Sequence, residues 1–177
     1  KRIIIADEVD RYRLTLGDDG LTWDQITARG QAWSTEKKVL AISTPTTAVG
    51  SIISQLHNEG DQHQYYVPCP YCGFMQLLDF SSDKGAGLAW DYKNGRIDKR
   101  SLRFICSGPG CGKDIRENQK PKMLLGGEWR ATARAIDEGI ASFHINGLYS
   151  PFLSWYEMAK GYDEAQNSPE KKQTFFN

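Results

Sequence analysis

The first sixty residues contain two short, continuously apolar runs separated by a helical pattern. Residues 1–6 (KRIIIA) and 38–43 (KVLAIS) lack the alternation of a half-exposed strand, and such runs are typical of parallel strands covered on both faces. Residues 22–34 carry apolar side chains at helical spacing, and a second helix is expected to follow a turn at 44–46 and to end near residue 57. This strand–helix–strand–helix order predicts an α/β sheet.

The pattern changes at residue 60. From there to about residue 115 the chain has short aromatic or apolar runs, many glycines and all four cysteines, which indicates a small β-rich insert. Ser154 and Glu157 have capping-box spacing at the start of the last confidently periodic segment. The helix, strand and helix expected after the insert span residues 118–125, 140–145 and 155–165.

The four cysteines form two pairs with the spacing of metal-binding knuckles. Cys69 and Cys72 are separated by two residues, and Cys106 and Cys111 by four. Each short loop lets two thiolates reach one ion, and a closed site of four thiolates is the signature of structural zinc. Disulfides and a redox-active Cys-x-x-Cys are the alternatives, but nothing marks the chain as secreted and two knuckles fit a closed site better. Zinc stabilises such a small ribbon by on the order of 10 kcal/mol.

Polar residues follow both apolar runs. Asp7 and Glu8 come directly after the first, and Ser43, Thr44 and Thr46 come at the end of the second. In P-loop NTPases an acid at this place holds Mg²⁺ against the nucleotide phosphates, and a neighbouring glutamate can activate the attacking water. Hydroxyls on the next strand could contact the γ-phosphate or that water. The alternatives are acids that leave the core and a simple turn with a helix N-cap.

Charge is distributed unevenly along the 177 residues, although the formal net charge is zero. The segment 93–122 holds nine basic and three acidic residues and therefore carries a net charge of +6. Such a segment can attract a phosphate backbone or form a solvated surface. No apolar run approaches the roughly 18 residues that a membrane span needs. The residues considered as a DNA-binding patch are Arg96, Lys99, Arg100 and Arg103.

Five segments, in their order along the chain, resemble the large subunits of GpA-type phage terminases. The segment IIADEVDRY resembles their Walker B motif, LAISTPT their coupling motif and YYVPCPYCG their zinc knuckle. The likeness covers nearly the whole chain, and the ordered set is specific although each motif alone is weak. The segments span residues 4–12, 40–46, 65–73, 127–132 and 143–151.

The resemblance implies an ATP-driven motor that packs double-stranded viral DNA into a procapsid in the host bacterial cytoplasm. It assigns Asp7 to Mg²⁺, Glu8 to the catalytic base, the hydroxyl residues 43, 44 and 46 to ATP–DNA coupling, and the four cysteines to Zn²⁺. The implied partners are a small terminase subunit, the portal protein and further copies of the large subunit in a ring.

The implied fold is a partial P-loop NTPase sheet of the ASCE type with a four-cysteine zinc-ribbon insert. Residues 1–60 would be the C-terminal part of the ATPase core, residues 61–116 the zinc ribbon, and residues 117–177 the end of the ATPase domain with a linker towards a nuclease domain. The parent protein would accordingly also be an endonuclease.

The chain departs from the family pattern in three respects: the second knuckle has four intervening residues instead of the commoner two, no acidic nuclease cluster is found, and the phosphate-binding loop is missing. It has no Gly-x4-Gly-Lys-Ser/Thr loop, so we expect the phosphate-binding half of the site before Lys1, the nuclease domain after Asn177, and no activity from this piece alone. A zinc-ribbon nucleic-acid-binding module and a superfamily-2-type helicase are the alternatives. The cysteine insert after the coupling strand favours the terminase over the helicase, and the ordered motifs favour it over a bare ribbon.

Overall fold

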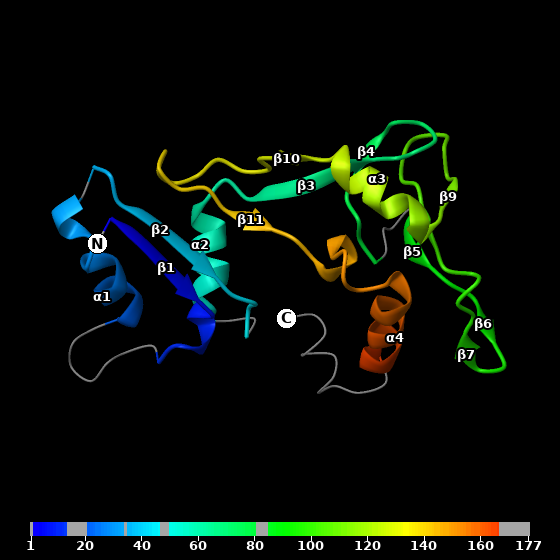
Figure 1. Cartoon of the computed structure of the whole chain (residues 1–177), viewed down its shortest axis with the longest axis horizontal. Helices are drawn as coiled ribbons and strands as arrows, with labels where there is room; N and C mark the ends of the chain where they lie inside the picture. The colour runs from blue at the N-terminus through cyan, green and yellow to red at the C-terminus, as the bar shows by residue number, and fades with distance from the viewer. Residues whose placement is uncertain (1, 14–20, 34, 47–49, 81–84, 167–177) are drawn as a thin grey trace. The chain divides into compact units, whose positions relative to one another are not determined.

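The computed structural model describes residues 2–13, 21–33, 35–46, 50–80 and 85–166. By the contacts within the chain it divides into two compact units, Lys1–Glu59 and Gly60–Phe176. Figure 1 shows the elements of each unit.

The first unit contains a pair of parallel strands and two helices. Strand β1 (Ile3–Asp7) pairs with β2 (Lys38–Ile42) so that their first residues and their last residues lie opposite one another. The predicted helix at 22–34 is shorter than expected: α1 ends at Ala28, and a separate 3-10 turn follows at Gln31–Trp33. The remaining elements are a 3-10 turn (Val9–Arg11), α1 (Thr22–Ala28) and α2 (Ile52–Glu59).

The two faces of the β1–β2 pair differ in burial. Ile3 and Ile5 are 64% and 67% exposed, and Leu40 and Ile42 on the same face are about half exposed. On the opposite face Ala6 is buried, and its neighbours on that face are partly buried. Within the described residues these strands are therefore covered on one face, since apolar content specifies a strand but not what packs against it.

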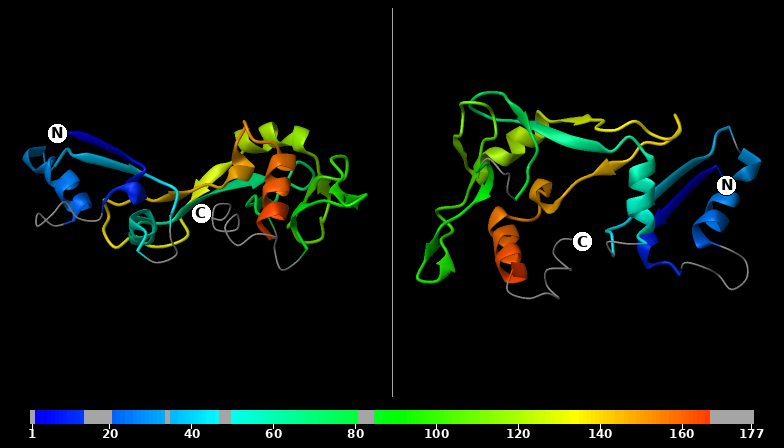
Figure 2. Two further views of the ribbon diagram at one scale, coloured as in Figure 1. Left: turned by 90° about the horizontal axis from the view of Figure 1, so that it is seen from below. Right: turned by 180° about the vertical axis from the view of Figure 1, so that it is seen from behind.

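The second unit is built on small sheets around one long strand. Strand β3 pairs with β10 and β4 in antiparallel fashion and with β11 in parallel. A three-stranded sheet follows the order β5-β8-β9, and β6 and β7 form a hairpin that projects from the rest of this unit (Figure 2). The strands are β3 (His63–Pro68), β4 (Met75–Gln76), β5 (Gly87–Ala89), β6 (Tyr92–Lys93), β7 (Arg96–Ile97), β8 (Arg103–Ile105), β9 (Asp114–Ile115), β10 (Glu128–Arg130) and β11 (Phe143–His144).

A continuous core joins these sheets to the C-terminal helices. Trp155 and Leu148 are fully buried, and Phe104 is 2% exposed. The hydroxyl of Tyr149 donates to the Tyr65 carbonyl (2.8 Å) and accepts from the Leu78 amide (2.8 Å), so this buried polar atom is satisfied. The helical elements are a 3-10 turn (Glu117–Gln119), α3 (Lys120–Leu125), a 3-10 turn (Gly147–Tyr149) and α4 (Trp155–Gln166).

The capping box predicted for the last helix is confirmed. The Ser154 amide and hydroxyl donate to Glu157 Oε2 (2.9 and 2.8 Å), and the Glu157 amide donates to Ser154 Oγ (3.2 Å). The hydrogen bond from the Ser154 backbone, with help from its hydroxyl, holds the pKa of Glu157 below its ordinary value. These bonds satisfy amide groups that the first turn of α4 leaves without helical partners.

Candidate functional site

The four cysteines converge on one point between two loops of the second unit. Cys69 and Cys72 lie between β3 and β4, and Cys106 and Cys111 lie between β8 and β9. All four Sγ atoms lie within 4.8 Å of one another, and all four cysteines are free. The 3.8 Å between the Sγ atoms of Cys72 and Cys106 is far longer than the roughly 2 Å of a disulfide bond.

The first knuckle has the backbone geometry of a tight metal-binding loop. The Tyr71 amide donates to Cys69 Sγ (3.5 Å), and the Gly73 amide donates to the Cys69 carbonyl (2.9 Å). Gly73 has a φ of 72°, a conformation that residues with a Cβ rarely adopt. Glycine after the second cysteine therefore allows the loop to turn back into β4.

The second knuckle shares the amide-to-sulfur contact of the first and has a longer loop. The Gly108 amide donates to Cys106 Sγ (3.3 Å), and the Cys111 amide donates to the Gly108 carbonyl (3.0 Å). A Cβ on Gly108 would lie 2.9 Å from the Cβ of Phe74, so the two knuckles approach closely here. The buried side chain of Gln76 accepts from the Ser107 amide (2.9 Å) and ties this loop to β4. The four residues between Cys106 and Cys111 therefore still allow both thiols to reach the common site.

The arrangement of the thiols fits a tetrahedral metal ion. Zinc–thiolate bonds of about 2.3 Å place tetrahedral sulfur atoms about 3.8 Å apart, which is close to the separations seen here. Burial raises the pKa of the Cys106 thiol, and hydrogen bonds with the other three cysteines raise it further. A cation at the centre would reverse this preference and stabilise the thiolates. The cluster is therefore compatible with zinc.

The acidic pair and the hydroxyl residues lie at the same end of the two parallel strands. Asp7 is the last residue of β1 and pairs with Ile42, the last residue of β2, so Ser43 follows directly beside it. Asp7 and Glu8 are both exposed. Two sequence motifs 35 residues apart thus meet at one edge of the sheet, as is usual for ligand-binding residues of parallel sheets.

Glu8 has an unusual backbone conformation. Its φ of 56° and ψ of 44° are left-handed, which is uncommon for a residue other than glycine. The fully buried Val9 follows it, and the Glu8 carboxylate contacts the Arg11 guanidinium at 3.0 Å. The backbone therefore turns sharply at the end of β1, and the carboxylate contacts a residue of the 3-10 turn that follows.

Asp10 connects the two motifs and was missed by the sequence analysis. Its amide donates to Ser43 Oγ (3.2 Å), and its Oδ2 accepts from the amide and the hydroxyl of Thr46 (3.0 and 3.3 Å). Its Oδ1 accepts from the Ile53 amide at 2.8 Å, near the start of α2. Burial alone would raise the pKa of Asp10, but the hydrogen bonds from Ile53, Ser51 and Thr46 lower it. The sequence feature that could have identified Asp10 is that it is a third acid close behind Asp7 and Glu8.

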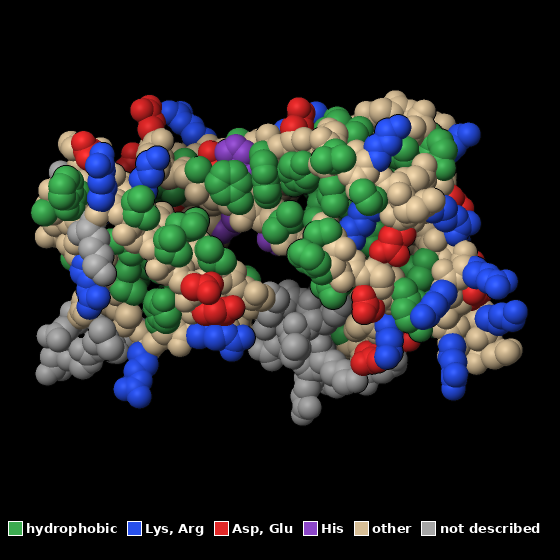
Figure 3. All heavy atoms as spheres, in the orientation of Figure 1, with side chains coloured by type: hydrophobic (Ala, Val, Ile, Leu, Met, Phe, Trp, Pro, Cys, Tyr) green, Lys and Arg blue, Asp and Glu red, His purple; other side chains and the backbone are tan. Residues whose placement is uncertain are grey.

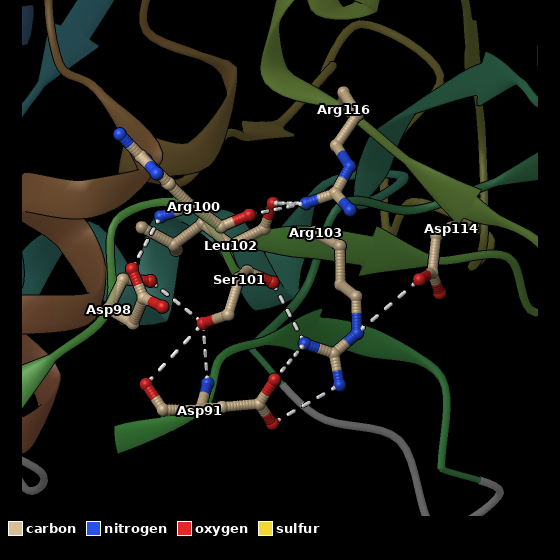
Figure 4. A network of polar contacts seen from close by, with 8 residues as sticks. All are labelled: Asp91, Asp98, Arg100, Ser101, Leu102, Arg103, Asp114 and Arg116. Atoms are coloured by element: carbon tan, nitrogen blue, oxygen red, sulfur yellow. Dashed lines mark hydrogen bonds and ion pairs between the residues drawn. The ribbon is translucent and has the colours of Figure 1, made fainter. Parts of the chain in front are cut away.

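The basic residues predicted to bind DNA fall into two groups. Arg103 is half-buried, and its guanidinium lies 3.1 Å from an Asp91 oxygen and 3.6 Å from an Asp114 oxygen (Figure 4). Figure 4 also shows the Arg116 guanidinium, which donates to the carbonyls of Arg100 and Leu102 at 2.9 Å each. Both guanidinium groups hold loop structure through these contacts.

The other three predicted basic residues lie on or beside the projecting hairpin. Arg96 is on β7, and Lys99 and Arg100 follow it; all three side chains are exposed. The Lys99 ammonium lies 4.2 Å from the centre of the Tyr156 ring. Figure 3 shows lysine and arginine side chains gathered over the part of the second unit that carries β6 and β7.

Among the helices that the structure describes, none combines the length and the apolar character that a membrane span requires.

The chain was compared with known protein families. The family model of the phage terminase large subunit gpA, ATPase domain, matches residues 1–129. The chain belongs to this terminase family. A second model, the endonuclease domain of terminase large subunit gpA, matches residues 140–177. Similarity to the nuclease domain thus begins inside the segment for which the sequence predicted only the end of the ATPase domain and a linker.

Two curated terminase large subunits resemble the chain. That of Enterobacteria phage P21 is 30% identical over 168 residues, and that of Escherichia phage lambda is 25% identical over 163 residues. Each alignment covers 84% of this chain and 24% of the relative, so the chain spans about a quarter of the length of these relatives. No solved structure matches the chain.

Proposed function

We propose that this chain carries the acidic and coupling half of the nucleotide site of a DNA-packaging terminase motor. The observation that carries this proposal is the meeting of Asp7 and Glu8 with Ser43 at the shared end of two parallel strands, in a segment that belongs to the terminase ATPase family. The fold we propose for residues 1–60 is part of an ASCE-type P-loop sheet. The family match also supports this function over a superfamily-2-type helicase.

In this proposal the two acids have separate roles. Mg²⁺ bound to ATP would neutralise phosphate charge, and the Asp7 carboxylate would hold the ion's coordination shell from the rigid end of β1. Glu8, at the left-handed turn that follows β1, would orient the attacking water and accept its proton.

The hydroxyl residues would transmit the state of the nucleotide. Ser43 and Thr44 directly follow β2, and Thr46 is joined to the acidic turn through Asp10. A change at the γ-phosphate could therefore displace the 43–46 segment and the start of α2 together. We assign to this segment the coupling of hydrolysis to DNA movement.

The second unit would have a structural and a DNA-contacting role. We propose that Cys69, Cys72, Cys106 and Cys111 bind one structural Zn²⁺ that holds the two knuckles together. Arg96, Lys99 and Arg100 on the projecting hairpin are proposed to contact the phosphate backbone of DNA. Arg103 is left out of this surface because Asp91 and Asp114 already neutralise its charge.

The function of the whole protein follows from the family and is proposed on that basis. It would package double-stranded viral DNA in the host bacterial cytoplasm as a ring of large subunits, together with a small terminase subunit and the portal protein. It would also cut DNA through its endonuclease domain. We retain the domain bounds 1–60, 61–116 and 117–177 as a proposal.

Substitution of Glu8 tests the proposed chemistry. In a terminase large subunit that carries this segment together with a phosphate-binding loop, Glu8→Gln is expected to bind ATP normally and to lower DNA-stimulated hydrolysis by about 10²- to 10⁴-fold. Glu36→Gln changes another exposed carboxylate of the same unit and should leave turnover unchanged. Normal turnover in the Glu8 variant would remove Glu8 from the role of base.

A further inference from the structure

The Asp10 side chain is the centre of a small polar network in the first unit. It uses both carboxylate oxygens as acceptors, Oδ2 for Thr46 and Oδ1 for Ile53. Its own amide donates to Ser43 Oγ. Three points of the segment from the end of β2 to the start of α2 are thus bonded to one residue of the turn that follows β1.

This network is placed next to the proposed catalytic base. Asp10 stands two residues after Glu8 in the 3-10 turn Val9–Arg11, and the residue between them is fully buried. The two residues after Glu8 are held in place. Val9 is packed in the interior, and Asp10 is hydrogen-bonded to Ser43 and Thr46, which follow β2. The backbone that carries Glu8 is therefore tied to the Ser43–Thr46 segment through Asp10.

We infer that Asp10 is a positioning residue that holds the coupling segment and the start of α2 in register with Glu8. The inference rests on the proposed ATPase function and adds to it a residue that acts through its contacts with Ser43, Thr46 and Ile53. Movement of the 43–46 segment on hydrolysis would reach Glu8 through Asp10, and DNA acting on that segment would set the orientation of the base by the same path.

The isosteric amide isolates this role. In Asp10→Asn one oxygen can still accept, but the amide nitrogen is a donor and cannot accept from an N–H group. Either the Thr46 amide or the Ile53 amide then loses its partner, while the volume of the side chain is preserved. Asp24→Asn is the matched control, since Asp24 is an exposed acid on α1 of the same unit.

Amide hydrogen exchange on the unliganded protein tests the network without any enzymatic readout. In the Asp10→Asn variant, exchange at whichever of the Thr46 and Ile53 amides loses its acceptor is expected to become at least about tenfold faster, whereas Asp24→Asn should leave both amides unchanged. Unchanged protection at both amides in the Asp10 variant would overturn the inference, because the carboxylate would then not hold the segment.

Kinetics on a large subunit with a complete nucleotide site tests the positioning. Asp10→Asn is expected to lower kcat for DNA-stimulated hydrolysis about tenfold, to leave KM for ATP within about twofold, and to reduce the ratio of DNA-stimulated to basal turnover. The double variant Asp10→Asn, Thr46→Val should lower kcat by less than the product of the two single-variant factors, because both substitutions remove the same contact.

The outcomes separate the inference from the function on which it rests. Faster exchange together with an unchanged kcat and unchanged DNA stimulation would overturn the positioning role and leave the proposed ATPase intact. A rise in KM with an unchanged kcat would also overturn it. A wild-type protein that does not hydrolyse ATP would overturn the proposed function itself.

Discussion

The two units of the chain are held by different physical means. In the second unit thirteen buried residues, among them Phe104, Leu148 and Trp155, form one continuous hydrophobic cluster, which includes two of the four converging cysteines. In the first unit the described residues contribute few buried side chains, chiefly Ala6 and Val9, and one strand face is open. What fixes the first unit around its functional residues is the set of hydrogen bonds to Asp10.

This difference shows how the two proposed tasks shape the structure. A scaffold gains from apolar packing and a closed metal site, because neither responds to a ligand. An edge that must respond to a nucleotide is better held by a few directional bonds that can break and re-form. Substitutions that remove the metal site, the apolar packing or the Asp10 hydrogen bonds one at a time should therefore affect the stability of one unit and leave the other unchanged.

Loss of the metal site should have the largest effect on stability. Cys72→Ser is expected to abolish stoichiometric zinc binding and to destabilise the second unit by on the order of 4 kcal/mol or more. Zinc analysis and hydrogen exchange would measure the two effects, and exchange in residues 3–13 should not change. A stable variant that keeps one zinc per chain would contradict the four-thiolate site.

The next largest effect on stability is expected from truncation of a core side chain. One truncation of an apolar side chain in each unit gives a matched pair of variants. Phe104→Ala should cost about 3–5 kcal/mol, because it leaves a cavity beside Trp155. Ile5→Ala, on the exposed face of β1, should cost less than about 0.5 kcal/mol in this 177-residue chain. Denaturant unfolding measures both; equal costs would mean that the two units do not differ in packing as described.

The projecting hairpin should contribute to DNA affinity rather than to stability. Arg96→Glu with Arg100→Glu is expected to weaken DNA binding at least about tenfold and to make its salt dependence shallower by up to about two units of slope. Lys99 is kept because its ammonium packs on Tyr156. Lys38→Glu with Lys122→Glu, an equal charge change elsewhere, serves as the control; identical losses in both pairs would leave only a net-charge effect.

The smallest effect is the pH dependence of the Asp10 network. Hydrogen bonds lower the pKa of Asp10 in the folded state, so its contribution to stability is present above the ordinary carboxyl pKa of about 3.9 and is lost as pH falls through the lower, folded value. In a titration followed by carboxyl chemical shifts, Asp10 should therefore titrate below the ordinary carboxyl pKa of about 3.9. A higher midpoint for Asp10 would mean that burial outweighs its hydrogen bonds.

Local patterns in the sequence predicted much of this structure. The apolar runs located β1 and β2, the periodicity located α4, and the Ser154–Glu157 spacing predicted its cap. The knuckle spacing predicted the cysteine cluster because two short loops constrain two thiols each. These features depend on neighbours in sequence.

Features that depend on distant residues were not predicted. Asp10 reads as an ordinary turn acid until the structure brings Thr46 and Ile53 to it. Arg103 counts as one more positive charge until Asp91 and Asp114 are seen on either side of it.

The most direct test of the central claim, that the end of β1 is a metal–nucleotide site, is the divalent-ion dependence of ATP binding and hydrolysis in Asp7→Asn. In a large subunit with a complete nucleotide site, the variant should need at least about tenfold more Mg²⁺ or Mn²⁺ for half-maximal activity and bind less Mn²⁺ in the presence of ATP. Asp24→Asn should behave as the wild type. Unchanged Mn²⁺ binding and turnover in the Asp7 variant would contradict the account.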